Sequence, residues 1–168
     1  MQYTLSSNGV ALGHTALELP ISAPQSLGGF FHPTDAFASV GAPLLAFAEQ
    51  LASLSPAVRD AMPPEAELAA VPPEERALRI RAALQANPWA QRLARLQAAV
   101  SALALELRDE QGTVVPTSDV LIAPFPLAAS LPLGVASDEL RSMYAESGDV
   151  AVELIIVVTR DRPKNGAA

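Results

Sequence analysis

Prolines divide the middle of this chain into short helical segments. Fifteen prolines occur in 168 residues, and a proline inside a helix removes a hydrogen bond and clashes with the preceding turn. In the first turn of a helix a proline is tolerated, because its missing N–H would have no partner there. Pro43, Pro56, Pro73 and Pro88 therefore predict separate helices, and residues 35–100 are expected to form a helical excursion.

Strand signals lie at the two ends of the chain. Asn8-Gly9 predicts a tight hairpin turn between strands over residues 3–5 and 10–19, because both positions favour the positive φ angles that such a turn needs. Residues 150–159 form the strongest predicted strand, apolar enough to lie in the centre of a sheet. Residues 20–33 are expected to be a loop, and residues 138–146 a helix.

The segment that follows Pro88 allows two interpretations. One set of residues recurs at helical spacing: Trp89, Leu93, Leu96, Val100 and Leu103. However, Leu103, Leu105 and Leu107 also alternate as in a strand. We favour a helix to about residue 99 and then a strand to residue 108, because residues 109–112 resemble a hairpin turn. A single helix over residues 88–109 is the alternative.

A proline-rich connection is predicted over residues 116–132. It contains a short strand over residues 120–122, and its prolines favour an edge position or a surface loop. Within it, Phe125 and Leu127 stand between prolines. An apolar loop of this kind needs a core or a partner to cover it, so both are candidate binding residues.

These patterns together predict an α+β fold. We expect a mostly antiparallel sheet built from N- and C-terminal strands, with the helical excursion (about residues 35–100) packed on one face. Strands and helices do not alternate regularly, as they would in a doubly wound parallel sheet. Residues 1–160 are expected to form a single domain and residues 161–168 a C-terminal tail.

The net charge of −7 argues against binding to nucleic acid or to anionic membranes, because both depend on excess Lys and Arg. Residues 1–58 contribute −3, residues 59–108 contribute +1 and residues 109–168 contribute −5. The acidity is therefore concentrated in the two end segments that are predicted to form the sheet.

The chain has no cysteine, which excludes disulfides, thiolate nucleophiles and cysteine-ligated metals. Its first residues lack the pattern of a secretory signal, and no apolar run is long enough to span a bilayer. A cytoplasmic location is therefore expected. Alanine is very frequent, and we attribute this bias to the codon usage of a GC-rich bacterial genome.

A loop at residues 28–35 is the main candidate for a catalytic or ligand site. It joins two glycines and two aromatics to His32 and Asp35 at a predicted helix start, where backbone N–H groups can bind an anion. Phe30, Phe31 and His32 are its candidate binding residues. The alternative interpretation is a glycine turn, two core phenylalanines and a helix cap at Thr34.

Glu18 is a third candidate catalytic residue beside His32 and Asp35. It lies on the same predicted strand face as His14 but about 13 Å away, which is too far for a shared proton or metal ion. Motifs for serine hydrolases, phosphate-binding loops, dinucleotide-binding folds and zinc peptidases are missing from the sequence. We therefore expect no metal and no cofactor, and we favour a protein that is not an enzyme.

Composition and motifs favour a bacterial protein-interaction module, such as an adaptor, an inhibitor or immunity-like protein, or an assembly component. It would act through its acidic surface and the proline-rich hydrophobic loop, on another protein or on a second copy of itself. One alternative is a small-molecule-binding protein or small enzyme that uses the loop at His32 and Asp35. Another is a self-assembling structural protein whose exposed strand edges pair between copies.

Overall fold

The computed structural model describes residues 1–19, 21, 25–128, 131 and 154–160. The strands are β1 (Tyr3–Ser7), β2 (Val10–Thr15), β3 (Ser26–Pro33), β4 (Leu105–Arg108), β5 (Val114–Val115), β6 (Thr117–Pro124) and β7 (Leu154–Arg160). The helices are α1 (Asp35–Val40), α2 (Ala42–Ala52), α3 (Leu54–Ala61), α4 (Glu65–Ala69), α5 (Pro73–Ala86), α6 (Pro88–Ser101) and α7 (Phe125–Ala128). The helix expected at residues 138–146 lies outside the described residues.

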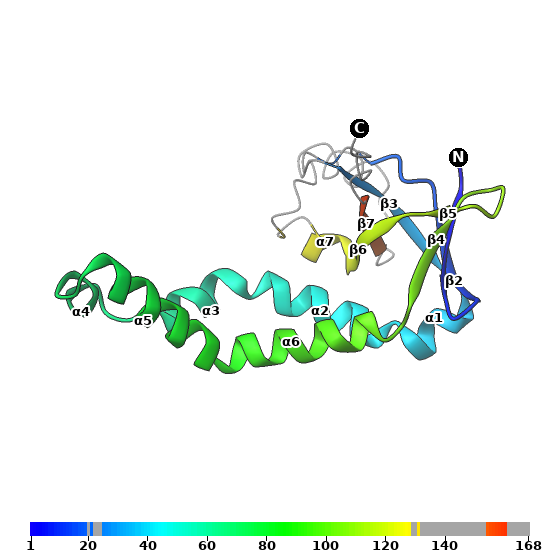
Figure 1. The fold of residues 1–168 in the computed structure, drawn as a ribbon. Helices are drawn as coiled ribbons and strands as arrows, with labels where there is room; N and C mark the ends of the chain where they lie inside the picture. The colour runs from blue at the N-terminus through cyan, green and yellow to red at the C-terminus, as the bar shows by residue number, and fades with distance from the viewer. Residues whose placement is uncertain (20, 22–24, 129–130, 132–153, 161–168) are drawn as a thin grey trace, which may run out of the picture.

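All seven strands belong to one antiparallel sheet in the order β5-β4-β1-β2-β3-β7-β6. The sheet curves strongly, and its N- and C-terminal strands lie side by side (Figure 1). Because β7 pairs with β3 on one side and β6 on the other, it lies in the interior of the sheet. The predicted α+β class and the predicted origin of the sheet are confirmed.

Both predicted hairpins form. Asn8 and Gly9 have φ angles of 49° and 81°, as a two-residue turn between β1 and β2 requires. In the second hairpin, the Asp109 side chain accepts hydrogen bonds from the backbone N–H groups of Gln111 and Thr113. That side chain therefore holds the turn that brings β5 back beside β4.

The loop predicted over residues 20–33 is wrong for its second half, because residues 26–33 form strand β3. Gly28 and Gly29 pair with Val157 and Ile156 of β7, and neither has a positive φ angle. A Cβ atom at Gly29 would lie 2.4 Å from Thr15 Oγ1 and 2.6 Å from the Leu17 backbone nitrogen. The glycines therefore permit close packing within the sheet, although they suggested a turn in the sequence.

Strand β7 contributes to both core clusters. Ile156 and Val158 lie in the first cluster with residues of β1, β2 and β4, such as Leu5. Ile155 and Val157 lie in the second cluster, between β6, α2 and α7. Burial on both faces explains why this strand is a continuous apolar run. The central strand predicted over residues 150–159 is confirmed for residues 154–159, and residues 150–153 lie outside the described residues.

Strand β6 is longer than expected and is followed by the short helix α7. The short strand predicted at residues 120–122 and its edge position are confirmed, whereas the irregular connection predicted around it is wrong for residues 117–119 and 123–128. Pro116 precedes the strand and Pro124 ends it, so neither proline interrupts the hydrogen bonds with β7.

Helices α1 and α2 pack against the sheet, and α6 runs beside α2 (Figure 1). Beyond them, α3, α4, α5 and the start of α6 extend away from the sheet as a helical arm, residues 54–93 (Figure 1). No described residue of the arm belongs to either core cluster. The predicted starts of α5 and α6 at Pro73 and Pro88 are confirmed.

The chain changes from helix to strand after α6, as favoured, and the single helix over residues 88–109 is wrong. The last helical turn tightens, with hydrogen bonds from the N–H groups of Leu103 and Ala104 to the carbonyls three residues earlier. Ala104 then adopts a left-handed conformation with φ 46°, and Leu107 pairs with Leu5 of β1. Pairing with β1 therefore decides which of the two periodicities prevails.

Candidate functional site

The three candidate catalytic residues are exposed and belong to different elements. His32 lies near the end of β3, Asp35 begins α1, and Glu18 follows β2. The Thr34 hydroxyl donates to the Ala11 carbonyl at 2.8 Å and does not cap α1. The structure therefore does not assemble a closed catalytic pocket from these residues, and their catalytic role stays a prediction.

The candidate binding residues divide between the two core clusters. Phe31 is buried in the first cluster, where its ring meets Phe37 edge-to-face with centroids 5.3 Å apart. Phe30, Phe125 and Leu127 are half-buried and pack against the second cluster. Much of the apolar surface of the proline-rich segment is therefore covered by the protein's own core. A binding role for these three residues stays a prediction.

The two histidines of the chain lie opposite each other in the sheet. His14 of β2 and His32 of β3 are register partners, and the His14 Nδ1 atom lies 3.1 Å from the Thr4 hydroxyl of β1. Sequence reasoning compared each histidine with its own neighbours, Glu18 and Asp35. It missed this pair because residues 26–33 were expected to be a loop, so no register between β2 and β3 was considered.

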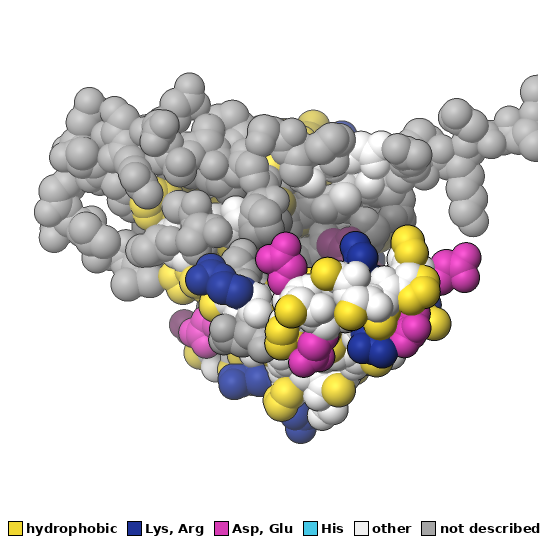
Figure 2. All heavy atoms as spheres, turned by 90° about the vertical axis from the view of Figure 1, so that its left-hand side faces the viewer, with side chains coloured by type: hydrophobic (Ala, Val, Ile, Leu, Met, Phe, Trp, Pro, Cys, Tyr) yellow, Lys and Arg dark blue, Asp and Glu magenta, His cyan; other side chains and the backbone are white. Residues whose placement is uncertain are grey.

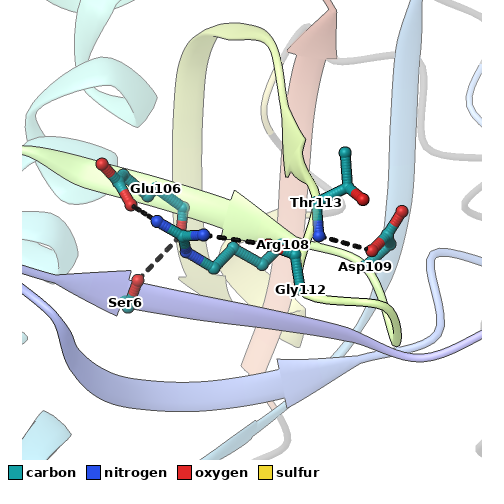
Figure 3. Close-up of polar contacts among 6 residues, drawn as sticks. All are labelled: Ser6, Glu106, Arg108, Asp109, Gly112 and Thr113. Atoms are coloured by element: carbon teal, nitrogen blue, oxygen red, sulfur yellow. Dashed lines mark hydrogen bonds and ion pairs between the residues drawn. The ribbon is translucent and has the colours of Figure 1, made fainter.

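Arg108 continues the same transverse row, because it pairs with Thr4 on the other side of β1. Its guanidinium is held by its own hairpin: Nη2 contacts Glu106 Oε2 at 2.7 Å, and Nη1 donates to the Gly112 carbonyl at 2.9 Å (Figure 3). The positive charge of Arg108 is therefore directed toward Glu106 and the β4–β5 turn.

A cleft of about 390 Å³ lies between the helices α2 and α6 and the strands β6 and β7. Its apolar lining includes Phe47, Leu51, Val100 and Val157, and Asp119 is the one charged residue among the lining residues. This size and mixture are typical of a small-molecule site. The sequence did not predict the cleft, because its walls come from five elements, the fifth being β4 through Leu105.

The arm presents apolar side chains to solvent. Helix α5 has no buried residue, and Leu78 is 62% exposed. A shallow groove of about 540 Å³ runs between α5 and the start of α6, lined by Ala77, Ile80, Arg81, Leu84, Gln85 and Ala90. Figure 2 looks onto the end of the arm and shows hydrophobic side chains interspersed with acidic and basic ones.

The base of the arm is fixed by the single tryptophan. Trp89 Nε1 donates to the Gln50 carbonyl at 3.0 Å and to Ser53 Oγ at 2.8 Å. The buried Gln50 side chain donates in return to the Trp89 carbonyl at 3.3 Å. Asn87 accepts from the Trp89 N–H at 2.8 Å, which confirms its predicted role as the cap of α6. These bonds join α6 to α2 where the arm leaves the sheet.

The chain matches no family model, no curated protein and no solved structure. Among the described residues, no group of three or more His, Asp or Glu side chains is placed to hold a metal ion. None of the described helices has the length and apolar character needed to cross a bilayer. The geometry of the described residues is therefore the basis for a functional proposal.

Proposed function

We propose that this protein is a non-enzymatic interaction module that binds another protein through the groove on its helical arm. The partner would insert an amphipathic segment that carries an acidic residue beside its apolar face. The exposed apolar surface of α5 carries this proposal. A bacterial source and a cytoplasmic location, which composition favours, belong to the same proposal.

The exposure of α5 supports a docking role. A surface helix normally buries one apolar stripe against its own protein. Here Ile80 and Leu84 remain only half-buried and Leu78 is exposed, although α6 lies beside them. An amphipathic partner segment would remove this surface from water, which stabilises a complex by about 25 cal/mol per Å² of apolar area before the costs of association.

Charge defines the partner further. Arg81 is the one charged residue of the groove lining. Helices α5 and α6 together carry five arginines and two glutamates, a difference of +3. A carboxylate on the partner would therefore meet complementary charge, which speeds association and fixes orientation.

The arm is also preorganised. The hydrogen bonds of Trp89 with Gln50 and Ser53 hold α6 in place before any partner arrives. Less conformational entropy is then lost on binding than for a segment that folds on contact. For these reasons the arm is a better contact surface than the proline-rich segment with Phe125 and Leu127, which packs against the core.

Site-directed photocrosslinking tests the proposal. A photoreactive phenylalanine analogue would replace Leu78 in one variant and Val10, which is 55% exposed on β2, in the matched control. After irradiation in extract of the source organism, we expect an adduct at position 78 that position 10 does not give. Mass spectrometry should map it to an acidic amphipathic segment, and Arg81→Glu should weaken it.

Three outcomes would contradict the proposal. Equal adducts at both positions would show that the arm is not selective, and no adduct at position 78 would show that it has no partner. An adduct with a peptide of this same chain would favour the self-assembling alternative. Light scattering at two protein concentrations would then show a rising mass.

The cleft beneath β6 supports a second candidate function, the binding of a small apolar molecule. Its volume of about 390 Å³ and its lining by Phe47, Leu51 and Val157 favour an apolar ligand with one polar end near Asp119. Ligand-observed NMR with a fragment library would detect binding. Ser101→Phe, which fills the cleft, should abolish the signals, and Ser39→Phe on α1 should leave them. Unchanged signals in both variants would exclude the cleft.

A further inference from the structure

We propose that His14 and His32 form a two-histidine binding site for a divalent transition-metal ion such as Zn²⁺. Neither histidine has a ligand-like neighbour in sequence, and the site exists only because β2 and β3 pair in one register. The inference is independent of the proposed partner at the arm.

The register gives the geometry. Directly opposed residues of an antiparallel pair project their side chains to the same face, with Cβ atoms about 4.5–5.5 Å apart. At this spacing, two imidazoles can each place a nitrogen about 2.0–2.1 Å from one ion. His14 and His32 are such a pair, and they are the chain's only histidines.

Thr4 orients one of the two ligands. Its hydroxyl lies 3.1 Å from His14 Nδ1, so Nδ1 is engaged and Nε2 is left to face an ion. Histidines that bind metals usually donate their second ring N–H to such a partner, which fixes the tautomer and the orientation of the ring. Thr4 belongs to β1, the strand next to β2, so its position is fixed by the sheet.

Gly13 lets the two strands approach closely beside the pair. A Cβ atom at this position would lie 2.4 Å from Phe31 Cζ and 2.6 Å from the His32 carbonyl oxygen. The pairing is continued past Pro33 by Thr34, whose N–H donates to the Leu12 carbonyl at 2.8 Å. The histidines are therefore carried by a rigid part of the sheet, which favours ligand positions that need little rearrangement.

Access and charge also suit a cation. His14 is half-buried and His32 is exposed, so water can reach an ion and complete its coordination. His32 also lines a shallow pocket with Glu110, whose carboxylate accepts a hydrogen bond from the Gln2 N–H. Arg108, the cation of the same row, is held by Glu106 and Gly112 (Figure 3). The net charge of −7 adds a favourable field.

Titration of the full-length, tag-free protein with ZnCl₂ tests the site. Isothermal titration calorimetry should show one equivalent bound. Long-range ¹H–¹⁵N NMR spectra should show the Nε2 resonance of His14 and one ring nitrogen of His32 shifting together. Because ligation joins β2 to β3, Zn²⁺ should also raise the melting temperature.

Variants separate this site from other zinc-binding groups. His14→Gln and His32→Gln should each weaken binding by more than tenfold, and Thr4→Val by about tenfold, as for other partners of metal-bound histidines. Glu49→Gln, at an exposed position on α2, is the matched control and should bind like the unmodified protein. Circular dichroism would verify that each variant is folded. Saturable binding that survives the double histidine variant would overturn the proposal, as would the absence of any shift at either imidazole.

Discussion

At Gly29 the backbone of β3 comes too close to its neighbours for a side chain to fit. The nearest contacts of a Cβ atom there would include the backbone nitrogen and Cα of Leu17, at 2.6 and 2.8 Å. Backbone atoms within a sheet cannot move aside without disturbing the hydrogen bonds around them. At Gly28 the close contacts come from the end of the Ile21 side chain, at 2.6 and 2.8 Å. A side chain can adopt another rotamer. The close contact at Gly28 can therefore be relieved, whereas the backbone contact at Gly29 cannot.

We therefore expect Gly29→Ala to lower the free energy of unfolding by about 1–3 kcal/mol, as overpacking in a core usually does. Gly28→Ala should lower it by less than about 1 kcal/mol, because Ile21 can yield and alanine restricts the unfolded chain. Urea denaturation followed by circular dichroism would measure both values. Equal losses in the two variants would show that the backbone contact at Gly29 is not the limiting one.

The same scale explains why the histidine pair could not be predicted. Which residue lies opposite His14 depends on the register between β2 and β3, and a register follows from the packing of the whole sheet. Locally, residues 28–33 carry two glycines and end in Pro33, a composition typical of loops. Only the pairing with β7 on one side and β2 on the other makes the segment a strand.

At the scale of elements, local residue patterns were sufficient to predict a turn, a helix start or a strand wherever the pattern is characteristic of that element. Asn8-Gly9 predicted the first hairpin, Asn87 with Pro88 predicted the start of α6, and the apolar run of residues 154–158 predicted an interior strand. The end of α6 has no such signal, since Ala104 adopts the left-handed conformation that glycine usually supplies at this position. The boundary between helix and strand was therefore predicted only approximately.

Two glycine substitutions with opposite expected effects on the free energy of unfolding test that boundary. Ala104→Gly should raise the free energy of unfolding by about 0.5–1 kcal/mol, because glycine adopts a positive φ angle without the strain that a Cβ atom introduces. Ala102→Gly is the matched control. That residue is also exposed but has a right-handed helical φ of −66°, so its replacement should lower stability by about 0.5–1 kcal/mol. Chemical denaturation of both variants would decide. A loss of stability in both variants would contradict a left-handed residue between α6 and β4.

At the scale of the whole molecule, the helices have two different roles. Helices α1 and α2 and the last turn of α6 supply core residues, among them Phe37, Leu44 and Val100. The arm supplies none that the structure describes. Prolines, capping residues and periodicity predicted α2, α5 and α6, but these signals could not distinguish a helix that covers the sheet from one that extends beyond it. That distinction depends on which apolar stripe finds a partner within the fold.

Removal of the outer arm should therefore leave a folded protein. Asn87 Nδ2 lies 3.5 Å from the Ala57 carbonyl, so a four-residue Gly/Ser linker can join Val58 to Asn87 in place of residues 59–86. Because the core clusters are retained and a shorter loop closes at little entropic cost, the free energy of unfolding should change by no more than about 1–2 kcal/mol. Fluorescence of the single tryptophan should remain native-like, since Gln50 and Ser53 still bind Trp89.

The shortened chain also tests whether stability and binding are separate properties of this fold. Added in excess, it should not compete with the full chain for the partner that crosslinks at position 78, because α5 and the groove are gone. It should keep the zinc site, because His14, His32 and Thr4 lie in the sheet. Loss of cooperative unfolding would instead show that the arm stabilises the core. The exposed Leu78 and the groove of the arm would then not be evidence for a partner. Retention of the same partner would place the contact outside the arm.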